Sequence, residues 1–310
     1  MQIFALPLVA LAGLAAGALA EGTCSGPNAR TEPPAGAIVV DATGAYKNSF
    51  RTVSEGVARL NPNTTSEQTV FVRPGVYNEQ VLISPLSGPL VLQGFTCDAM
   101  SYASNEVTIT QAKAQKDIPA EVKGEARNDM TSTVRFKSDN VKVYNLNIAN
   151  TAGNVGQALA VNVNATDYGF YACNLTGYQD TVLADKGREL YARTGRESES
   201  SPASYVFNRA RVFGSSGVNS TVLGRPWRPY ARVIWQNSEL GDVVKPEGWT
   251  TWDSTSSTAN VTFKEYNNSG PGAATANRVA FSGQLDAPVA ITELLGEGYE
   301  TEWWVDTNYL

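Results

Sequence analysis

The chain has 310 residues, with 24 Lys plus Arg against 30 Asp plus Glu, so its formal net charge is −6 and its isoelectric point is near 4.9. This acidic balance argues against non-specific nucleic-acid binding. Histidine is absent, which excludes the Ser-His-Asp and Cys-His hydrolase arrangements and the His-ligated zinc sites. Any hydrolysis by this chain must therefore use carboxylates or another base.

The first twenty residues, 1–20, carry no charge and end in Ala18-Leu19-Ala20. This pattern predicts a secretory signal that is cleaved after Ala20, so that the mature protein begins at Glu21. A membrane anchor is the alternative, but Pro7 and the many Gly and Ala residues favour a removed signal. We therefore expect a secreted, extracellular protein. Residues 21–310 contain no Pro/Ser-rich linker and no run of charge, which favours a single domain.

One short helical pattern precedes a long β pattern. Apolar residues recur at spacings of three and four between Phe50 and Leu60, which predicts a short amphipathic helix over Asn48–Leu60. The rest of the chain alternates as strands do, for example at 69–72, 107–110, 141–144 and 232–235. These strands are short and end in Asn and Gly. We therefore expect an all-β fold.

Two strand segments also resemble each other. Residues 143–148 align with residues 170–175 at an offset of 27 positions. A repeat of this length indicates stacked units that cannot bury their apolar faces alone. This favours a parallel β-helix, whose open N-terminal edge the early helix would cap. An antiparallel sandwich or barrel remains an alternative on periodicity alone.

The three cysteines, Cys24, Cys97 and Cys173, allow at most one disulfide and have no metal-ligand spacing, so no metal is expected. The sequence predicts no pairing, but it predicts that Cys173, in an apolar strand, is a buried and inert thiol. Asn174 fits the glycosylation rule but precedes an important strand end, so we expect it to be buried and unmodified. The predicted glycosylation sites are Asn63, Asn164, Asn219, Asn260 and Asn267.

Five polar or aromatic residues could together act on an acyl group of a sugar. Gln179 and Asp180 end an apolar strand, Gln157 opens another, and Arg225 and Trp227 flank a proline. The amides could donate to an oxyanion, the carboxylate could move a proton and the guanidinium could keep a second carboxylate ionised. The indole could stack on a sugar ring. Taken singly, a strand-end Asp is more often a turn cap, and a Trp is more often a core residue.

Together these motifs resemble the pectin methylesterase family, over most of the mature chain and in the same order. The motifs that carry the resemblance are 75–79, 150–153, 157–159, 177–181, 223–227 and 265–273. The resemblance implies a right-handed parallel β-helix that hydrolyses methyl esters of polygalacturonate without a metal or a cofactor. It implies pectin as the partner of a monomeric enzyme, with no role for nucleic acid or a membrane.

The same resemblance implies a role for each site residue. Asp180 matches the general acid and base, and Gln157 and Gln179 match the amides that stabilise the oxyanion. Arg225 matches the residue that pairs with a nucleophilic carboxylate, and Trp227 matches an aromatic residue that stacks on the substrate. In such a mechanism a second, ionised Asp attacks the ester carbonyl while Asp180 protonates methanol.

That second Asp has no counterpart in the sequence. The family carries it in a motif similar to Asp-Phe-Ile-Phe-Gly, about one coil after the first Asp, whereas here 188–192 runs directly into 193–197. The resemblance therefore implies that about 20–50 residues, judged by repeat lengths, are lacking near 192/193. Asp185 is a poor substitute, because it lies roughly 16 Å along an extended strand from Asp180 and on the opposite face. Glu189 and Glu197 have no matching context.

Two classes of function stay open at this point. The chain is either a pectin methylesterase, whose missing coil is a gene-model error or is survivable, or a non-catalytic relic that binds pectin. A pectin lyase of similar fold is a third reading, but no group of calcium-binding carboxylates beside a basic residue supports it.

Overall fold

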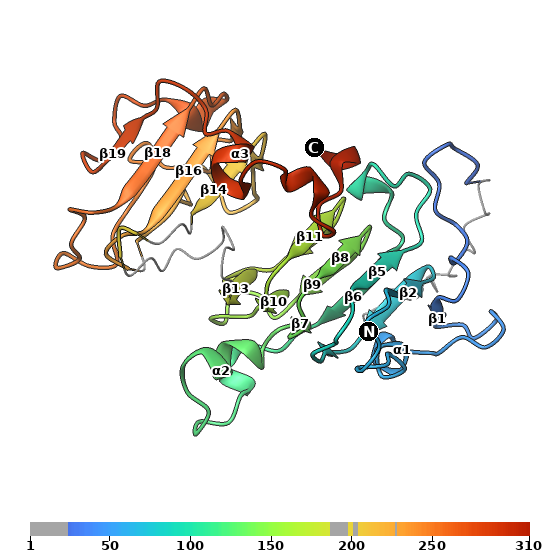
Figure 1. The fold of residues 1–310 in the computed structure, drawn as a ribbon. Helices are drawn as coiled ribbons and strands as arrows, with labels where there is room; N and C mark the ends of the chain where they lie inside the picture. The colour runs from blue at the N-terminus through green and yellow to red at the C-terminus, as the bar shows by residue number, and fades with distance from the viewer. Residues whose placement is uncertain (1–23, 187–197, 201–203, 227) are drawn as a thin grey trace, which may run out of the picture.

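The computed structural model describes residues 24–186, 198–200, 204–226 and 228–310 (Figure 1). In these residues all pairings between the named strands are parallel, because the chain winds in coils and each strand lies beside the strand of the next coil. The coils form two stacks, one over 38–186 and one over 205–284, and each stack has its own hydrophobic core. The four sequence segments predicted as strands all lie in strands.

The first stack has three parallel sheets, one for each side of the coil. The first sheet contains β1 (Ile38–Val40), β2 (Gln68–Val72), β5 (Leu90–Gly94), β8 (Val141–Tyr144) and β11 (Tyr168–Tyr171). The second contains β4 (Val81–Ile83), β7 (Val134–Phe136), β10 (Val161–Asn164) and β13 (Val182–Lys186). The third contains β3 (Gly75–Asn78), β6 (Val107–Gln111), β9 (Asn147–Asn150) and β12 (Asn174–Thr176).

The second stack has two sheets and a compact aromatic core. Its strands are β14 (Tyr205–Asn208), β16 (Arg232–Gln236), β18 (Thr262–Tyr266) and β19 (Ser282–Gln284) in one sheet, and β15 (Arg211–Val212) and β17 (Glu239–Leu240) in the other. Trp249 and Phe263 stack at 4.5 Å between ring centroids. A buried ion pair closes this core, since Arg278 Nε lies 2.7 Å from Glu265 Oε1 and the Trp249 indole donates to the same oxygen.

The internal repeat predicted from the sequence is the coil itself. Tyr171 pairs with Tyr144 and Leu175 pairs with Ile148, each at the predicted offset of 27 residues. Side chains at equivalent positions therefore form columns along the stack, as a solenoid requires.

The predicted N-terminal helix exists but is shorter than expected. We predicted Asn48–Leu60, whereas α1 spans only Val53–Val57. Thr52 is its N-cap and accepts a hydrogen bond from the Glu55 backbone N–H, which starts the helix there. Asn48 has a φ of 62°, a left-handed conformation that no helix contains. As predicted, α1 packs on the first coil, against β1 and β4.

The end of the chain returns from the second stack to the first. After α3 (Ile291–Leu295), residues 299–310, called the C-terminal strap below, lie against the outer face of the first sheet (Figure 1). The Tyr144 hydroxyl donates to Asp306 Oδ2 at 2.8 Å, and the Tyr171 hydroxyl donates to Trp304 O at 2.6 Å. Tyr309 completes this cluster with its ring 5.0 Å from that of Tyr171. The strap thus links the two stacks.

The structure agrees with some of the predictions for cysteine and asparagine residues and contradicts others. Cys24 and Cys97 form a disulfide, while Cys173 is free and only partly buried at the residue level. Burial of its sulfur raises the pKa of the Cys173 thiol to about 11, which agrees with an inert group. The prediction that Asn174 is buried was wrong, because it lies exposed on β12; that it is unmodified stays a prediction. Among the predicted glycosylation sites, those that are exposed are Asn63, Asn219, Asn260 and Asn267.

A helix able to cross a membrane does not occur among the described residues.

Candidate active site

Three of the predicted site residues lie on adjacent coils of the first stack. Gln157 precedes β10, and Gln179 and Asp180 precede β13, which pairs directly with β10. The Ala158 N–H donates to Gln179 O at 3.2 Å, so the backbone joins the two glutamine positions. The coil pairing therefore brings the backbone segments that carry Gln157, Gln179 and Asp180 next to one another.

Asp180 has an unusual backbone and an altered acidity. Its φ is 57°, in the left-handed region that non-glycine residues enter rarely and often at functional sites. The side chain reaches solvent, but the protein around it removes part of the hydration of its carboxylate, and this raises the pKa of Asp180 above the usual value. The positive charge of Arg225 acts in the opposite direction. The carboxyl is thus suited to hold a proton that it can later donate.

Arg225 comes from the second stack, so the site combines both. The Leu223 N–H donates to Gly248 O at 2.7 Å and fixes the segment that carries Arg225. The guanidinium carbon lies 3.8 Å from the ring centroid of Trp252, within the range of a cation–π contact. Trp252 is 48% exposed, an aromatic surface that the sequence analysis did not single out. Its position in the polar segment 250–256 was the available signal.

The other predicted residues are not all placed. Trp227 lies outside the described residues, and so do 188–192 and 193–197, which flank the expected deletion. Asp185 is the extra residue of a bulge in β13, since Val163 pairs with Ala184 and Asn164 pairs with Lys186.

In the part of the chain that the structure describes, β13 is the last strand of the second sheet, and no further strand covers this end of the first stack. Val81, Val134, Val161 and Val182 form one column through the second sheet. The first three are fully buried, whereas Val182 is 48% exposed. Tyr178, next to Gln179, is 58% exposed. Interior side chains of the last coil thus lack the cover that each earlier coil receives from the next one.

Within the described part of the chain, one group of potential metal ligands gathers closely: Cys24, Cys97 and Glu106. Both cysteines of that group are joined in the disulfide, so it offers no thiolates to a metal.

Comparison with known proteins identifies the family. The family model described as Pectinesterase matches residues 37–198 and 193–291. A pectinesterase of Aspergillus niger is 40% identical over 324 aligned positions, which cover 91% of this chain and 94% of the relative. A pectinesterase of Aspergillus aculeatus is 38% identical over 323 positions, which cover 90% of this chain and 94% of the relative.

Solved structures agree with the fold. The pectin methylesterase from Aspergillus niger superposes with a TM-score of 0.76 at 32% identity, over 91% of this chain and all of that one. Pectin methylesterase from carrot, at 22% identity, gives 0.69 over 83% of this chain and 90% of that one, which supports the fold alone. The predicted right-handed parallel β-helix with a capping helix is confirmed, and the sandwich alternative was wrong. The chain therefore belongs to the pectinesterase family, the carboxylic ester hydrolases that remove methyl esters from pectin.

Proposed function

We propose that pectin demethylesterification in this chain uses Gln157, Gln179, Asp180 and Arg225 as its machinery, with Trp227 as a sugar-stacking residue. The observation that carries the proposal is the placement of Asp180 and Gln179 beside the Gln157 coil through the Ala158–Gln179 hydrogen bond. Partial burial raises the pKa of Asp180, as a proton donor requires. Backbone and side-chain groups of this kind need no metal to polarise an ester.

The proposed chemistry has two steps. An ionised carboxylate attacks the ester carbonyl carbon, the bond to the methoxy group breaks, and Asp180 gives its proton to the departing oxygen, which leaves as methanol. The two amides hold the negative oxygen of the intermediate. Water then attacks the resulting anhydride, Asp180 accepts a proton from that water, and the galacturonate carboxylate leaves. Arg225 keeps the attacking carboxylate ionised.

We infer that the attacking carboxylate belongs to a coil that this chain lacks. The open end at Val182 supports this inference, because the last coil of a solenoid needs a cap or a further coil to cover its interior. In the second stack, Tyr205 and Phe207 of β14 are only partly buried. Strand β11 ends the first sheet, and β14 begins a separate sheet.

The alignments to relatives support the same inference. The alignment with the Aspergillus niger relative runs over 324 positions but covers 91% of 310 residues, which is about 282. About 40 aligned positions therefore have no residue of this chain, a length within the repeat range of a solenoid. The family matches this chain in two pieces that meet at 193–198, close to the predicted deletion at 192/193.

Substitutions in a chain that carries the missing segment test the assigned roles. Gln157→Ala and Gln179→Ala should each lower kcat about 10²-fold with KM nearly unchanged, because an oxyanion contact forms mainly in the transition state. Asp180→Asn should remove most of the remaining turnover of methylated pectin. Methanol release is the measurement. If both glutamine variants keep full kcat, the assignment of the oxyanion site is wrong.

We also propose that the protein is secreted as a monomer after cleavage at Ala20. The Cys24–Cys97 disulfide supports this, because such bonds persist in oxidising compartments. N-terminal sequencing of the secreted product should find Glu21 as the first residue, and sedimentation should give a single chain. An intact Met1 on the secreted product would falsify the cleavage.

A further inference from the structure

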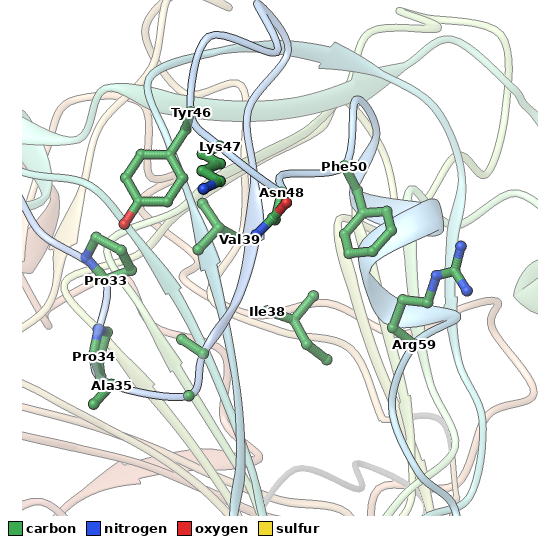
Figure 2. A pocket seen from close by; sticks show the side chains of 12 residues that line it. Pro33, Pro34, Ala35, Ile38, Val39, Tyr46, Lys47, Asn48, Phe50 and Arg59 are labelled. Carbon is green, nitrogen blue, oxygen red and sulfur yellow. The ribbon is translucent and has the colours of Figure 1, made fainter.

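A pocket lies at the end of the first stack opposite to the site. It has a volume of about 590 Å³, within the usual range for small-ligand sites, and Pro33, Pro34, Tyr46, Lys47, Phe50 and Arg59 contribute to its lining. This set defines the N-terminal pocket. Figure 2 shows Tyr46 and the two prolines along one side, Phe50 and Arg59 along the other, and Lys47 between them.

The charge of this pocket differs from that of the chain. The whole chain is acidic, with a net charge of −6, but the twelve lining residues include Lys47 and Arg59 and no Asp or Glu. Both cationic side chains are exposed. The pocket is therefore a local positive site on a negative protein, and it should attract anions.

The nearest carboxylates on the same segment are already engaged. Asp41 is buried, and it accepts hydrogen bonds from the Thr43 hydroxyl at 2.7 Å and the Tyr46 N–H at 2.8 Å. Glu55 accepts from the backbone N–H groups of Arg51 and Thr52 at the start of α1. Glu32 is exposed beside Pro33 but does not line the pocket. The lining residues therefore include two positive charges and no carboxylate.

The two aromatic rings are held in place by cations. The guanidinium carbon of Arg73 lies 5.2 Å from the ring centroid of Tyr46, and that of Arg59 lies 4.9 Å from the ring centroid of Phe50. Both rings are half-buried, so each presents part of its surface at the pocket. Aromatic surfaces beside cationic groups suit a sugar acid, whose ring offers C–H groups and whose carboxylate offers a charge.

We propose that the N-terminal pocket binds de-esterified, anionic galacturonate units of pectin, at a distance from the catalytic residues. Lys47 and Arg59 would bind carboxylates, and Tyr46 and Phe50 would contact sugar rings. The pocket adjoins β1, and Asp180 follows the coil of β11, four strand spacings along the same stack, or about 19 Å. The proposal rests on the proposed function, because it concerns the same polymer.

Such a site would use the product of the reaction to hold the substrate. A pectin chain anchored through a stretch without methyl esters keeps its remaining esters near the protein, which raises their effective concentration at the active site. The effect needs a polymer long enough to span both sites. Short methyl-esterified oligomers, which cannot span both sites, would react without this gain in effective concentration.

Binding can be tested without turnover, by calorimetric titration of the chain carrying Asp180→Asn and Arg225→Gln with non-esterified tetragalacturonate at low salt. Arg225→Gln weakens binding at the catalytic groove, so that the pocket dominates. Adding Lys47→Gln and Arg59→Gln should lower the remaining affinity about tenfold, the loss expected for two partly exposed charge contacts. Lys116→Gln with Lys123→Gln changes the same charge on exposed residues elsewhere and should leave the affinity unchanged.

Each outcome decides the proposal. An affinity that Lys47→Gln and Arg59→Gln leave unchanged overturns it, as does an equal loss in the Lys116 and Lys123 control, which would show only non-specific attraction. A dimer that the pocket variant dissociates would assign the surface to a second copy of the chain instead. Failure of the catalytic proposal looks different, because Gln157→Ala and Gln179→Ala would then keep full kcat in a chain that carries the missing segment, while binding still depends on Lys47 and Arg59.

Discussion

The two ends of the first stack differ in how the interior side chains of the terminal coil are covered. At the N-terminal end α1 covers the first coil, and Val40 and Val53 are fully buried. A Cβ on Gly56 would lie 2.5 Å from Val40 Cγ2, so glycine allows the helix to approach the strand this closely. At the other end, Val182 continues a buried column but is 48% exposed. A solenoid end is stable when an element is dedicated to covering it, and no helix or strand among the described residues covers the end beside Asp180.

This difference explains why the active site depends on the junction between the stacks. Gln157, Gln179 and Asp180 belong to the open end of the first stack, whereas Arg225 and Trp252 belong to the second. The C-terminal strap connects the stacks through the tyrosines of β8 and β11. The proposed catalytic groups therefore lie where the sheets of the first stack end and those of the second begin.

The first prediction concerns the largest effect, the missing coil. Inserting the corresponding segment of about 40 residues from the Aspergillus niger relative near residue 192 should raise methanol release from methylated pectin at least ~10³-fold. The inserted coil would supply the attacking carboxylate and would cover Val182. The thermal unfolding transition of the chimera should also be more cooperative than that of the original chain.

The matched control for that experiment is the same insertion with its Asp-Phe-Ile-Phe-Gly aspartate changed to Asn. It should fold like the active chimera but release methanol no faster than the original chain. Equal methanol release by the original chain and the chimera would show that no coil is needed and that another group attacks the ester.

The second prediction compares two valines of one column. Val134→Ala removes two methyl groups from a fully buried position and should lower the free energy of unfolding by about 2 kcal/mol. Val182→Ala should cost less than about 1 kcal/mol, because Val182 is half exposed. In the chimera with the added coil the two costs should become similar. Chemical denaturation measures them, and equal costs in the original chain would contradict the open end.

The sequence predicted the strands of the repeating coil better than it predicted where the N-terminal helix begins and ends. Alternation and the 27-residue repeat identified the strands, because register fixes equivalent residues such as Tyr144 and Tyr171 side by side. The helix was predicted too long, because apolar spacing continues through Phe50 and Leu60 while the left-handed Asn48 and the Thr52 cap confine the helix itself. Periodicity reports which residues are buried, and it does not report where the backbone leaves the helix.

The site was predicted residue by residue, mainly from family motifs. The Ala158–Gln179 hydrogen bond joins the backbone segments that carry the predicted residues of the first stack, whereas the family motifs gave no indication that Trp252 lies over Arg225. Asn174 was misjudged because its place in the strand that leads to Asp180 was taken to mean burial, whereas its position on β12 is exposed. The contact of Trp252 with Arg225 depends on which segments are neighbours in space, information that a single strand does not contain.

The third prediction tests the strap that holds the stacks together. Tyr171→Phe removes the hydroxyl that donates to Trp304 O and accepts from the Asp306 N–H, both in the strap. Loss of these bonds should lower the free energy of unfolding by about 1 kcal/mol. Hydrogen exchange should increase first in 299–310. Tyr168→Phe is a control hydroxyl deletion that leaves the strap intact, and equal exchange in the strap for both variants would contradict this role.

The fourth prediction concerns the electrostatic link across the junction. Arg225→Gln should raise the pKa of Asp180 further, because the guanidinium charge now opposes the upward shift caused by partial burial. Arg225→Lys keeps the charge and should restore most of the original pKa. Carbon-13 NMR titration of the Asp180 carboxyl measures both.

A raised pKa means that the folded protein holds the proton of Asp180 more tightly than the unfolded chain does. The group therefore stabilises the fold at low pH, and that contribution is lost as the pH rises through the pKa of the folded state. In the chimera, the pH at which Asp180 stops acting as a general acid should be higher with Arg225→Gln than with Arg225, and Arg225→Lys should bring it most of the way back. If Arg225→Gln leaves the pKa of Asp180 unchanged, the charge of Arg225 in the second stack does not act on Asp180 in the first.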